Sequence, residues 1–209
     1  MPKDVEALTG VDLTDFAAAV AALRVHHPGY APGYFYPTFP FQTTLANAGM
    51  SSGQIRLTPM LIMSRVSISE LGFRVNTVAT NSNVQAAIYR SHATTRRPTT
   101  LVGSTPSQAG TVVGNFSVAL TGGPFTLEPG LHWFATNSDA APILNGLAPH
   151  GTAFGFWIGA VTQANILQNA VGGISVLSQT FGTWPDLTAA TFADQSSAQP
   201  AGTFKVAAA

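Results

Sequence analysis

The sequence has 209 residues and no cysteine, and its nine basic residues balance its nine acidic ones. Charged residues make up only 9% of the chain, against roughly 25% in an average soluble domain. Because nucleic acid and anionic membranes attract a surplus of basic residues, neither is expected as a partner. The lack of cysteine excludes a disulfide framework and a cysteine-ligated zinc site.

Apolar residues still make up 45% of the chain, which is enough for a substantial core. The 20 glycines and 14 prolines, together with frequent threonine and serine, are typical of a protein rich in strands and turns. No uncharged apolar stretch of about 18 residues occurs, so we expect no membrane insertion. Since a neutral chain with few charges is poorly soluble as a free monomer, we expect an oligomer.

Residues 12–24 have the pattern of a short amphipathic helix. Asp12 is a suitable N-cap, and the alanine-rich run over 17–22 has a high helix propensity. We expect this helix to take part in anchoring or assembly. Its apolar face would consist of Phe16, Val20 and Leu23.

An aromatic, proline-rich segment follows, from residue 30 to residue 41. Prolines at 32, 37 and 40 cannot donate to a sheet, so the segment is expected to be an extended arm or edge. Six aromatic rings are too many to leave in water, and the arm should lie on its own domain or on a neighbouring subunit. The helix and arm together define an assembly region over 1–50. The rings are those of Tyr30, Tyr34, Phe35, Tyr36, Phe39 and Phe41.

The rest of the chain, residues 51–209, consists of short apolar stretches separated by turns. Several of them alternate between apolar and polar residues, and no second helix is evident, so we predict an all-β fold, a jelly-roll-like antiparallel sandwich. The stretches are 55–63, 66–75, 84–89, 111–113, 116–120, 131–135, 154–158 and 202–207. The residues expected in its core are Ile68, Phe73, Val75, Ile88, Leu131 and Trp133.

Four passages, in their order along the chain, resemble a β-sandwich domain of tailed-bacteriophage virion proteins of the tail-fibre, receptor-binding or minor structural type. They are LTPMLI at 57–62, ISELGFRV at 68–75, AIYR at 87–90 with Pro98 in the following loop, and LEPGLHWFA at 127–135. Ala87 stands where that family has glycine, and His132 stands where it has tyrosine. The resemblance implies a virion structural role and a homotrimer, and it brings no catalytic residues with it.

The residues themselves give no catalytic or metal-binding motif. The five histidines do not have the spacing of a metal-ligand pair, so neither a metal nor a cofactor is expected. Glycoside hydrolysis needs two carboxylates facing each other across a sugar, and no acidic residue lies in a recognisable motif of this kind. In the turn at 128–130, proline followed by glycine predicts a positive φ at Gly130.

Sugar binding is the activity that the residue types favour. Carbohydrate sites on β-sandwiches combine flat aromatic faces with amide, carboxylate and hydroxyl groups. Trp184 lies in a loop flanked by glycine and proline, whereas the position of Trp157 within FGFWI favours the core or a subunit contact over a sugar site. The candidates for carbohydrate contact are Trp157, Trp184, Tyr89, Asn137, Asp139 and Asn145.

Three classes of protein compete: a virion structural protein, a free carbohydrate-binding module or lectin, and a small β-sandwich hydrolase. We predict the first, in the form of a compact oligomeric surface projection such as a short tail fibre, a spike or a head decoration. It would be assembled in the host cytoplasm as a homotrimer. Its partners would be other virion proteins, through the N-terminal region, and host surface polysaccharide.

Overall fold

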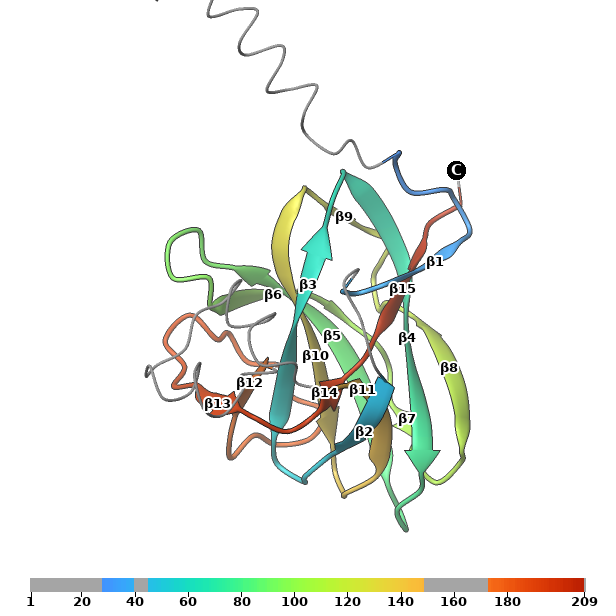
Figure 1. Ribbon diagram of the computed structural model, residues 1–209, viewed down its shortest axis with the longest axis vertical. Helices are drawn as coiled ribbons and strands as arrows, with labels where there is room; N and C mark the ends of the chain where they lie inside the picture. Colours follow the sequence, from blue (N-terminus) through green and yellow to red (C-terminus); the bar gives the residue numbers. More distant parts are fainter. Residues whose placement is uncertain (1–27, 40–44, 149–172, 209) are drawn as a thin grey trace, which may run out of the picture.

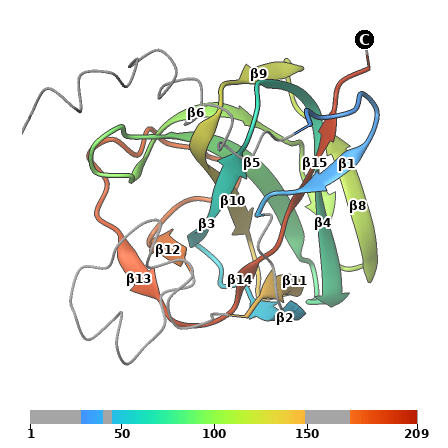
Figure 2. The ribbon, with the colours of Figure 1, turned by 45° about the horizontal axis from the view of Figure 1, so that its top comes forward.

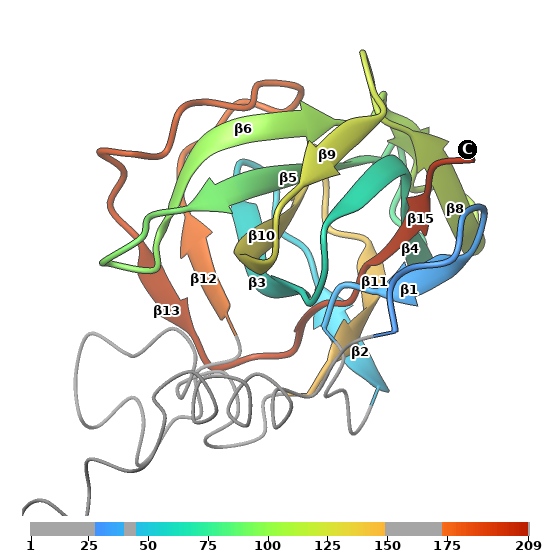
Figure 3. The ribbon, with the colours of Figure 1, turned by 90° about the horizontal axis from the view of Figure 1, so that it is seen from above.

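The computed structural model describes residues 28–39, 45–148 and 173–208. These residues form two antiparallel β-sheets that pack face to face, as Figure 3 shows from above. The predicted β-sandwich is therefore confirmed. The helix predicted over 12–24, with Phe16, Val20 and Leu23, lies outside the described residues.

The eight-stranded sheet, called sheet A from here on, is built around the long strand β4. One edge of β4 pairs with β9 and β8, and the other pairs first with β15 and then with β11. The sheet forks there, because β1 adds to the far edge of β15 while β2 adds to the far edge of β11. The strands are β1 (Phe35–Pro37), β2 (Leu45–Gly49), β4 (Val66–Thr77), β8 (Gly114–Ala119), β9 (Phe125–Leu127), β11 (Ile143–Leu147), β14 (Gln199–Pro200) and β15 (Thr203–Val206).

The branch point of the fork is occupied by the last described strands. β14 pairs with β11, and after residues 201–202 the chain continues as β15 beside β4. Figure 2 shows this segment running from the β11 and β2 branch to the β1 branch.

The seven-stranded sheet, called sheet B, has the order β13-β12-β3-β10-β5-β6, and β7 pairs with β5 beside β6. Its central strands β3, β10 and β5 include three of the stretches predicted from alternation. The strands are β3 (Ile55–Ile62), β5 (Asn83–Ser91), β6 (Pro98–Ser104), β7 (Gln108–Ala109), β10 (Gly130–Ser138), β12 (Gly173–Val176) and β13 (Ala193–Gln195).

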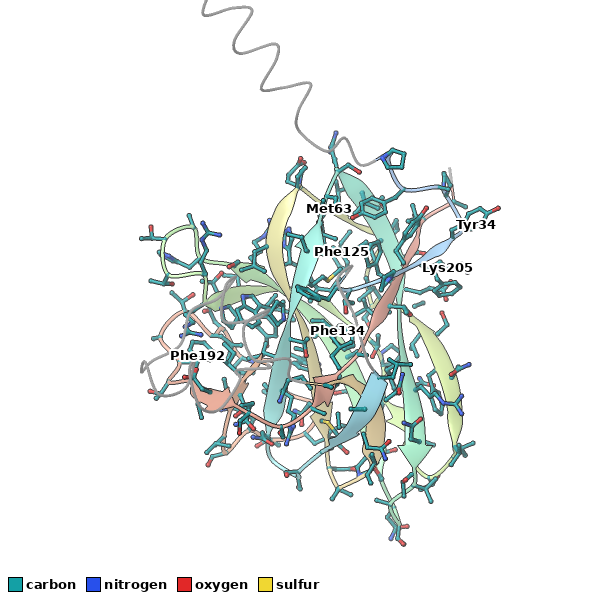
Figure 4. The ribbon with its side chains drawn as sticks, in the orientation of Figure 1. Tyr34, Met63, Phe125, Phe134, Phe192 and Lys205 are labelled. Carbon is teal, nitrogen blue, oxygen red and sulfur yellow. The ribbon has the colours of Figure 1, made fainter. Side chains whose placement is uncertain are left out.

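The main core lies between the two sheets, and Phe134 at its centre is visible in Figure 4. β4 contributes on both sides of a bulge, because Val206 is opposite Ile68 whereas Lys205 is opposite Glu70. The extra residue at this bulge allows Ile68 and Leu71 to face the core together. Five of the six expected core residues are buried, while Leu131 is half-buried. The buried five are Ile68, Phe73, Val75, Ile88 and Trp133.

A second apolar cluster covers the outer face of sheet B. Trp133 and Tyr89 are fully buried there, although they point away from the inter-sheet core. The chain between β12 and β13 covers them: the Trp184 ring packs 6.3 Å from the Tyr89 ring, and Leu187 is buried beside them. The backbone NH of Leu187 donates to the carbonyl of Thr99, which ties this segment to β6. The sandwich thus has a third layer on this side.

The part of the aromatic arm that the structure describes belongs to the sandwich. Tyr30 and Tyr36 lie edge to face, 4.8 Å apart, and both pack on Phe204 of β15. Phe39 is only 3% exposed, whereas Tyr34 is 67% exposed and projects beside β1 (Figure 4). The arm's predicted edge position is confirmed, because β15 is the one described strand that pairs with β1. Phe41 lies outside the described residues.

Two expectations about boundaries are wrong. β1 and β2 are strands of sheet A, so the sheet begins before residue 51, where we expected the sandwich to start. Residues 111–113 form a turn and not a strand, because the backbone of Gly110 bonds to Ser82 at the tip of a neighbouring loop. The predicted positive φ of Gly130 is confirmed at 140°. The stretch 154–158 lies outside the described residues.

Candidate binding groove

A groove of about 600 Å³ crosses the outer face of sheet A at the fork. Its floor is formed by β4 and β8, and its walls come from the two branches, β1 with β15 and β2 with β11. The described residues that line it are Phe35, Pro37, Leu45, Gly72, Phe73, Arg74, Asn115, Phe116, Ser117, Asn145, Ala201, Gly202 and Thr203.

Two glycines lie where the branches separate, and both allow neighbouring segments to approach closely. Gly72 is opposite Thr203 in the ladder, and a methyl group on Gly72 would collide with the hydroxyl of Thr203. A methyl group on Gly202 would come within 2.5 Å of the Phe134 ring, so the chain here passes directly over the core. Neither glycine has a positive φ, so close approach is the feature that requires glycine at both positions.

The walls of the groove are apolar and accessible. Phe35 is 49% exposed and Leu45 is 56% exposed, and they stand on opposite branches of the fork. The Phe116 ring, which stacks on Phe73 with 5.4 Å between ring centroids, packs against the core on the other side of the floor. The exposed ring of Phe35 is therefore the aromatic surface that the groove offers to a ligand.

At the end of the groove farther from Phe35, polar side chains form a connected network of hydrogen bonds. Arg74 Nε donates to Asn76 Oδ1 at 3.0 Å, and its Nη1 donates to Asn115 Oδ1 at 2.9 Å. Asn76 Nδ2 in turn donates to Asn47 at 3.1 Å and to Asn145 at 3.5 Å. Neighbouring strands thus place one guanidinium and four amides on the same open face.

An ion pair lies at the end of the groove beside Phe35, called its upper end from here on. Lys205 Nζ is 2.6 Å from Glu70 Oε1 and 5.4 Å from the centroid of the Phe35 ring. Ser117 Oγ donates to the other carboxylate oxygen of Glu70. The hydrogen bond from Lys205, followed by the one from Ser117, holds the pKa of Glu70 below its ordinary value. The two charges neutralise each other at this end.

Of the predicted carbohydrate contacts, the structure brings Asn145 to the groove, on strand β11. Trp157 lies outside the described residues. Trp184 is in a loop, as expected, but it is half-buried against Tyr89.

Tyr89 is not a surface residue, contrary to our expectation. Its side chain is 0% exposed, and its hydroxyl donates to the carbonyl of Pro185 at 2.9 Å. Burial raises the pKa of this phenol. The alternation of β5 puts Tyr89 on the outer face of sheet B, where the chain after β12 covers it.

Asn137 and Asp139 also have structural positions. Asn137 lies within β10 and is 0% exposed, so it offers no surface to a sugar. Asp139 accepts the backbone NH of Asn83 at 2.6 Å and the Asn83 side-chain amide at 2.7 Å. Both carboxylate oxygens of Asp139 are thus used to join the ends of β5 and β10.

Phe35 and Arg74 are the most important of the groove residues that were not among the predicted sugar contacts. Phe35 was expected to serve assembly, and Arg74 was not singled out. The alternation of β4 held the signal for Arg74: Leu71, Phe73 and Val75 face the core, which leaves Arg74 and Asn76 on the open face. Nothing in the sequence indicates that β1, over a hundred residues from β15, would bring Phe35 beside them.

Two negative findings concern only the part of the chain that the structure describes. Within it, no group of three or more histidine or acidic side chains is placed to hold a metal ion. Within the same residues, no helix has the length and apolar character needed to cross a membrane.

Comparisons with known proteins add little to this geometry. No family model matches the sequence, and no curated protein matches it. One similar solved structure is that of the clostridial cysteine protease Cwp84 after propeptide cleavage, with 10% identity and a TM-score of 0.40. The similarity covers 82% of this chain and 40% of that chain.

Proposed function

We propose that the protein is a structural protein of a tailed-bacteriophage virion, a compact projection that binds host surface glycans through the groove on sheet A. The groove is the observation that carries the proposal. It combines the exposed Phe35 ring with amides of Asn115 and Asn145 and the Arg74 guanidinium. Sugars present flat C–H faces and many hydroxyl groups, and this mixture of groups is complementary to both.

The position of the ends of the described chain supports a projection. The segment before β1 and the segment after β15 lie at the same end of the sandwich (Figure 1). Attachment to other virion proteins through residues 1–27 would leave the opposite end of the sandwich turned away from the particle. We further propose a jelly-roll-like sandwich, a homotrimer and assembly in the host cytoplasm, as the family resemblance implies.

We propose that this role is non-catalytic. The described residues that line the groove include no aspartate or glutamate, whereas glycoside hydrolysis requires two carboxylates across the sugar. Glu70, at the upper end, is already bound by Lys205 and Ser117.

Binding is tested on a glycan array with the full-length chain and two matched variants. Phe35→Ala removes the groove's exposed ring, and we expect it to weaken binding at least about fivefold, the ratio for ~1 kcal/mol. Tyr34→Ala removes the neighbouring exposed ring, which does not line the groove, and should bind like the original protein. Absence of binding to every glycan, or equal losses in the two variants, would contradict the proposal.

Location on the particle needs a separate experiment, because a free carbohydrate-binding module would behave identically on the array. An antibody against the folded protein should label intact phage particles in immunogold electron microscopy. Glycan binding combined with unlabelled particles would favour the free module.

A further inference from the structure

Arg74 carries the one charge in the groove that the described residues leave uncompensated. The described ion pairs are Arg65 with Glu128 and Lys205 with Glu70. Arg74 is exposed, and among the described residues it bonds only to the neutral amides of Asn76 and Asn115. A lining without carboxylates thus surrounds a guanidinium, and the net charge of the groove is positive.

The guanidinium is also held in place. Nε bonds along β4 and Nη1 bonds across to β8, so the plane of the group is fixed by two strands. Its Nη2 has no partner among the described residues. A fixed, planar guanidinium with free N–H groups matches the two oxygens of a carboxylate, and such charge-assisted bonds are about twice as strong as neutral ones.

We infer that the groove binds an acidic oligosaccharide, with a sugar carboxylate at Arg74 and a sugar ring against Phe35; this inference rests on the proposed glycan binding. Phe35 is opposite Lys205, which is opposite Glu70, four residues along β4 from Arg74. At about 3.3 Å per residue, the two contacts are separated by about 13 Å along the strand. A ligand that touches both must be longer than one sugar ring.

The geometry favours a saccharide over a peptide strand. An extended peptide binds by adding to a free sheet edge through backbone hydrogen bonds. The groove lies over the face of sheet A, where β4 is paired on both edges with β8 and β15. Side-chain amides, hydroxyls and rings are therefore the groups that a ligand meets.

The experiment uses the full-length protein and pairs of oligosaccharides, each uronic-acid or sialic-acid glycan beside its carboxyl-reduced counterpart. We expect the acid to bind about tenfold more tightly than its reduced form by calorimetry, and the difference to shrink at high salt. Arg74→Gln should abolish the difference. Arg65→Gln, an exposed arginine outside the groove lining, should preserve it.

Four outcomes separate this inference from the proposed function. Acid preference in the original protein that disappears only in Arg74→Gln supports the inference. Equal binding of acid and reduced forms, sensitive to Phe35→Ala, overturns it and leaves glycan binding intact. Acid preference that persists in Arg74→Gln also overturns it. No binding of any glycan overturns the proposed function, and the inference with it. Denaturation midpoints establish that both arginine variants are folded.

Discussion

At the scale of single residues, Gly202 links the groove to the core. It lies between β14 and β15, where the chain passes over the ring of Phe134, and an added methyl group would come within 2.5 Å of that ring. Phe134 is fully buried between the sheets and cannot withdraw into solvent. The floor of the groove thus depends on contact between the backbone and the core.

Gly202→Ala should therefore lower the free energy of unfolding by about 1–3 kcal/mol, because the strand or the ring must shift. Urea denaturation followed by tryptophan fluorescence measures this change. Gly49→Ala is the control, since no heavy atom lies within 4 Å of an added methyl group there and its φ is not positive. A Gly202→Ala variant as stable as the Gly49→Ala variant would contradict the described packing.

The ion pair between Glu70 and Lys205 contributes to the stability of the folded protein in a way that depends on pH. Lys205 and Ser117 lower the pKa of Glu70 below its ordinary value of 4.5, which means that the folded state favours the ionised form. The resulting stabilisation is fully present above the unfolded-state pKa and is lost as pH falls through the folded-state pKa. Exposure of the pair to solvent keeps this contribution modest.

Glu70→Gln should accordingly have a lower free energy of unfolding than the original protein near neutral pH. This gap in unfolding free energy should close as the pH falls below the folded-state pKa of Glu70. Denaturant unfolding at a series of pH values measures the gap. Glu128→Gln serves as a control, because the ion pair between Glu128 and Arg65 is largely exposed to solvent. A constant gap at all pH values would mean that the carboxylate of Glu70 is not stabilised by Lys205.

At the scale of elements, the alternating strands could be predicted and the pairing between distant segments could not. The sequences of β3 and β4 contain stretches of alternation, and β3, β4, β5 and β10 all lie close to the expected ranges. Tyr89 and Asn137 were misplaced because alternation assigns a side chain to one of two faces without showing that the outer face of sheet B is covered as well. β12 and the chain after it form that cover, and local sequence does not reveal it.

The groove was still harder to predict from the sequence, because its position depends on where the two branches of sheet A separate. β1 and β2 are short and contain proline or glycine, so their propensity is weak. They become strands by pairing with β15 and β11. Phe35 and Asn145 reach one groove through these long-range pairings alone.

The arm yields a prediction at this same scale. Deleting residues 1–41 should destabilise the sandwich more than deleting residues 1–27, because the longer deletion removes β1 and the rings of Tyr30, Tyr36 and Phe39 that pack on the chain. We expect the difference in unfolding free energy to be at least about 3 kcal/mol, the cost typical of losing one large buried ring. Equal stability of the two truncated chains would show that the arm packs elsewhere.

At the scale of the whole molecule, low charge favours self-association. Only 9% of the residues are charged, and Tyr34 and Leu177 are large apolar side chains exposed on the described surface. Closed threefold symmetry buries such surface without open-ended growth. This is the physical reason to expect the homotrimer that we propose.

Light scattering on the full chain at micromolar concentration should therefore give three times the 21.7 kDa mass of one chain. Deleting residues 1–27 should lower the trimer fraction, since we propose that this region takes part in assembly. The described sandwich stays present in that variant, so circular dichroism should remain that of a β-protein. A single species of one-chain mass in the full-length protein would contradict the trimer.

The position of β15 also determines the order in which the protein can be built. Lys205 and Glu70 are 135 residues apart in the chain, yet they are neighbours in sheet A. While a ribosome is still making the chain, the part of the β4 edge along residues 68–72 stays open until residues 203–206 have left the exit tunnel. During that interval the open edge can accept β15 from another nascent copy as well as its own. Strand exchange between copies made on the same messenger is therefore the assembly error that this topology permits.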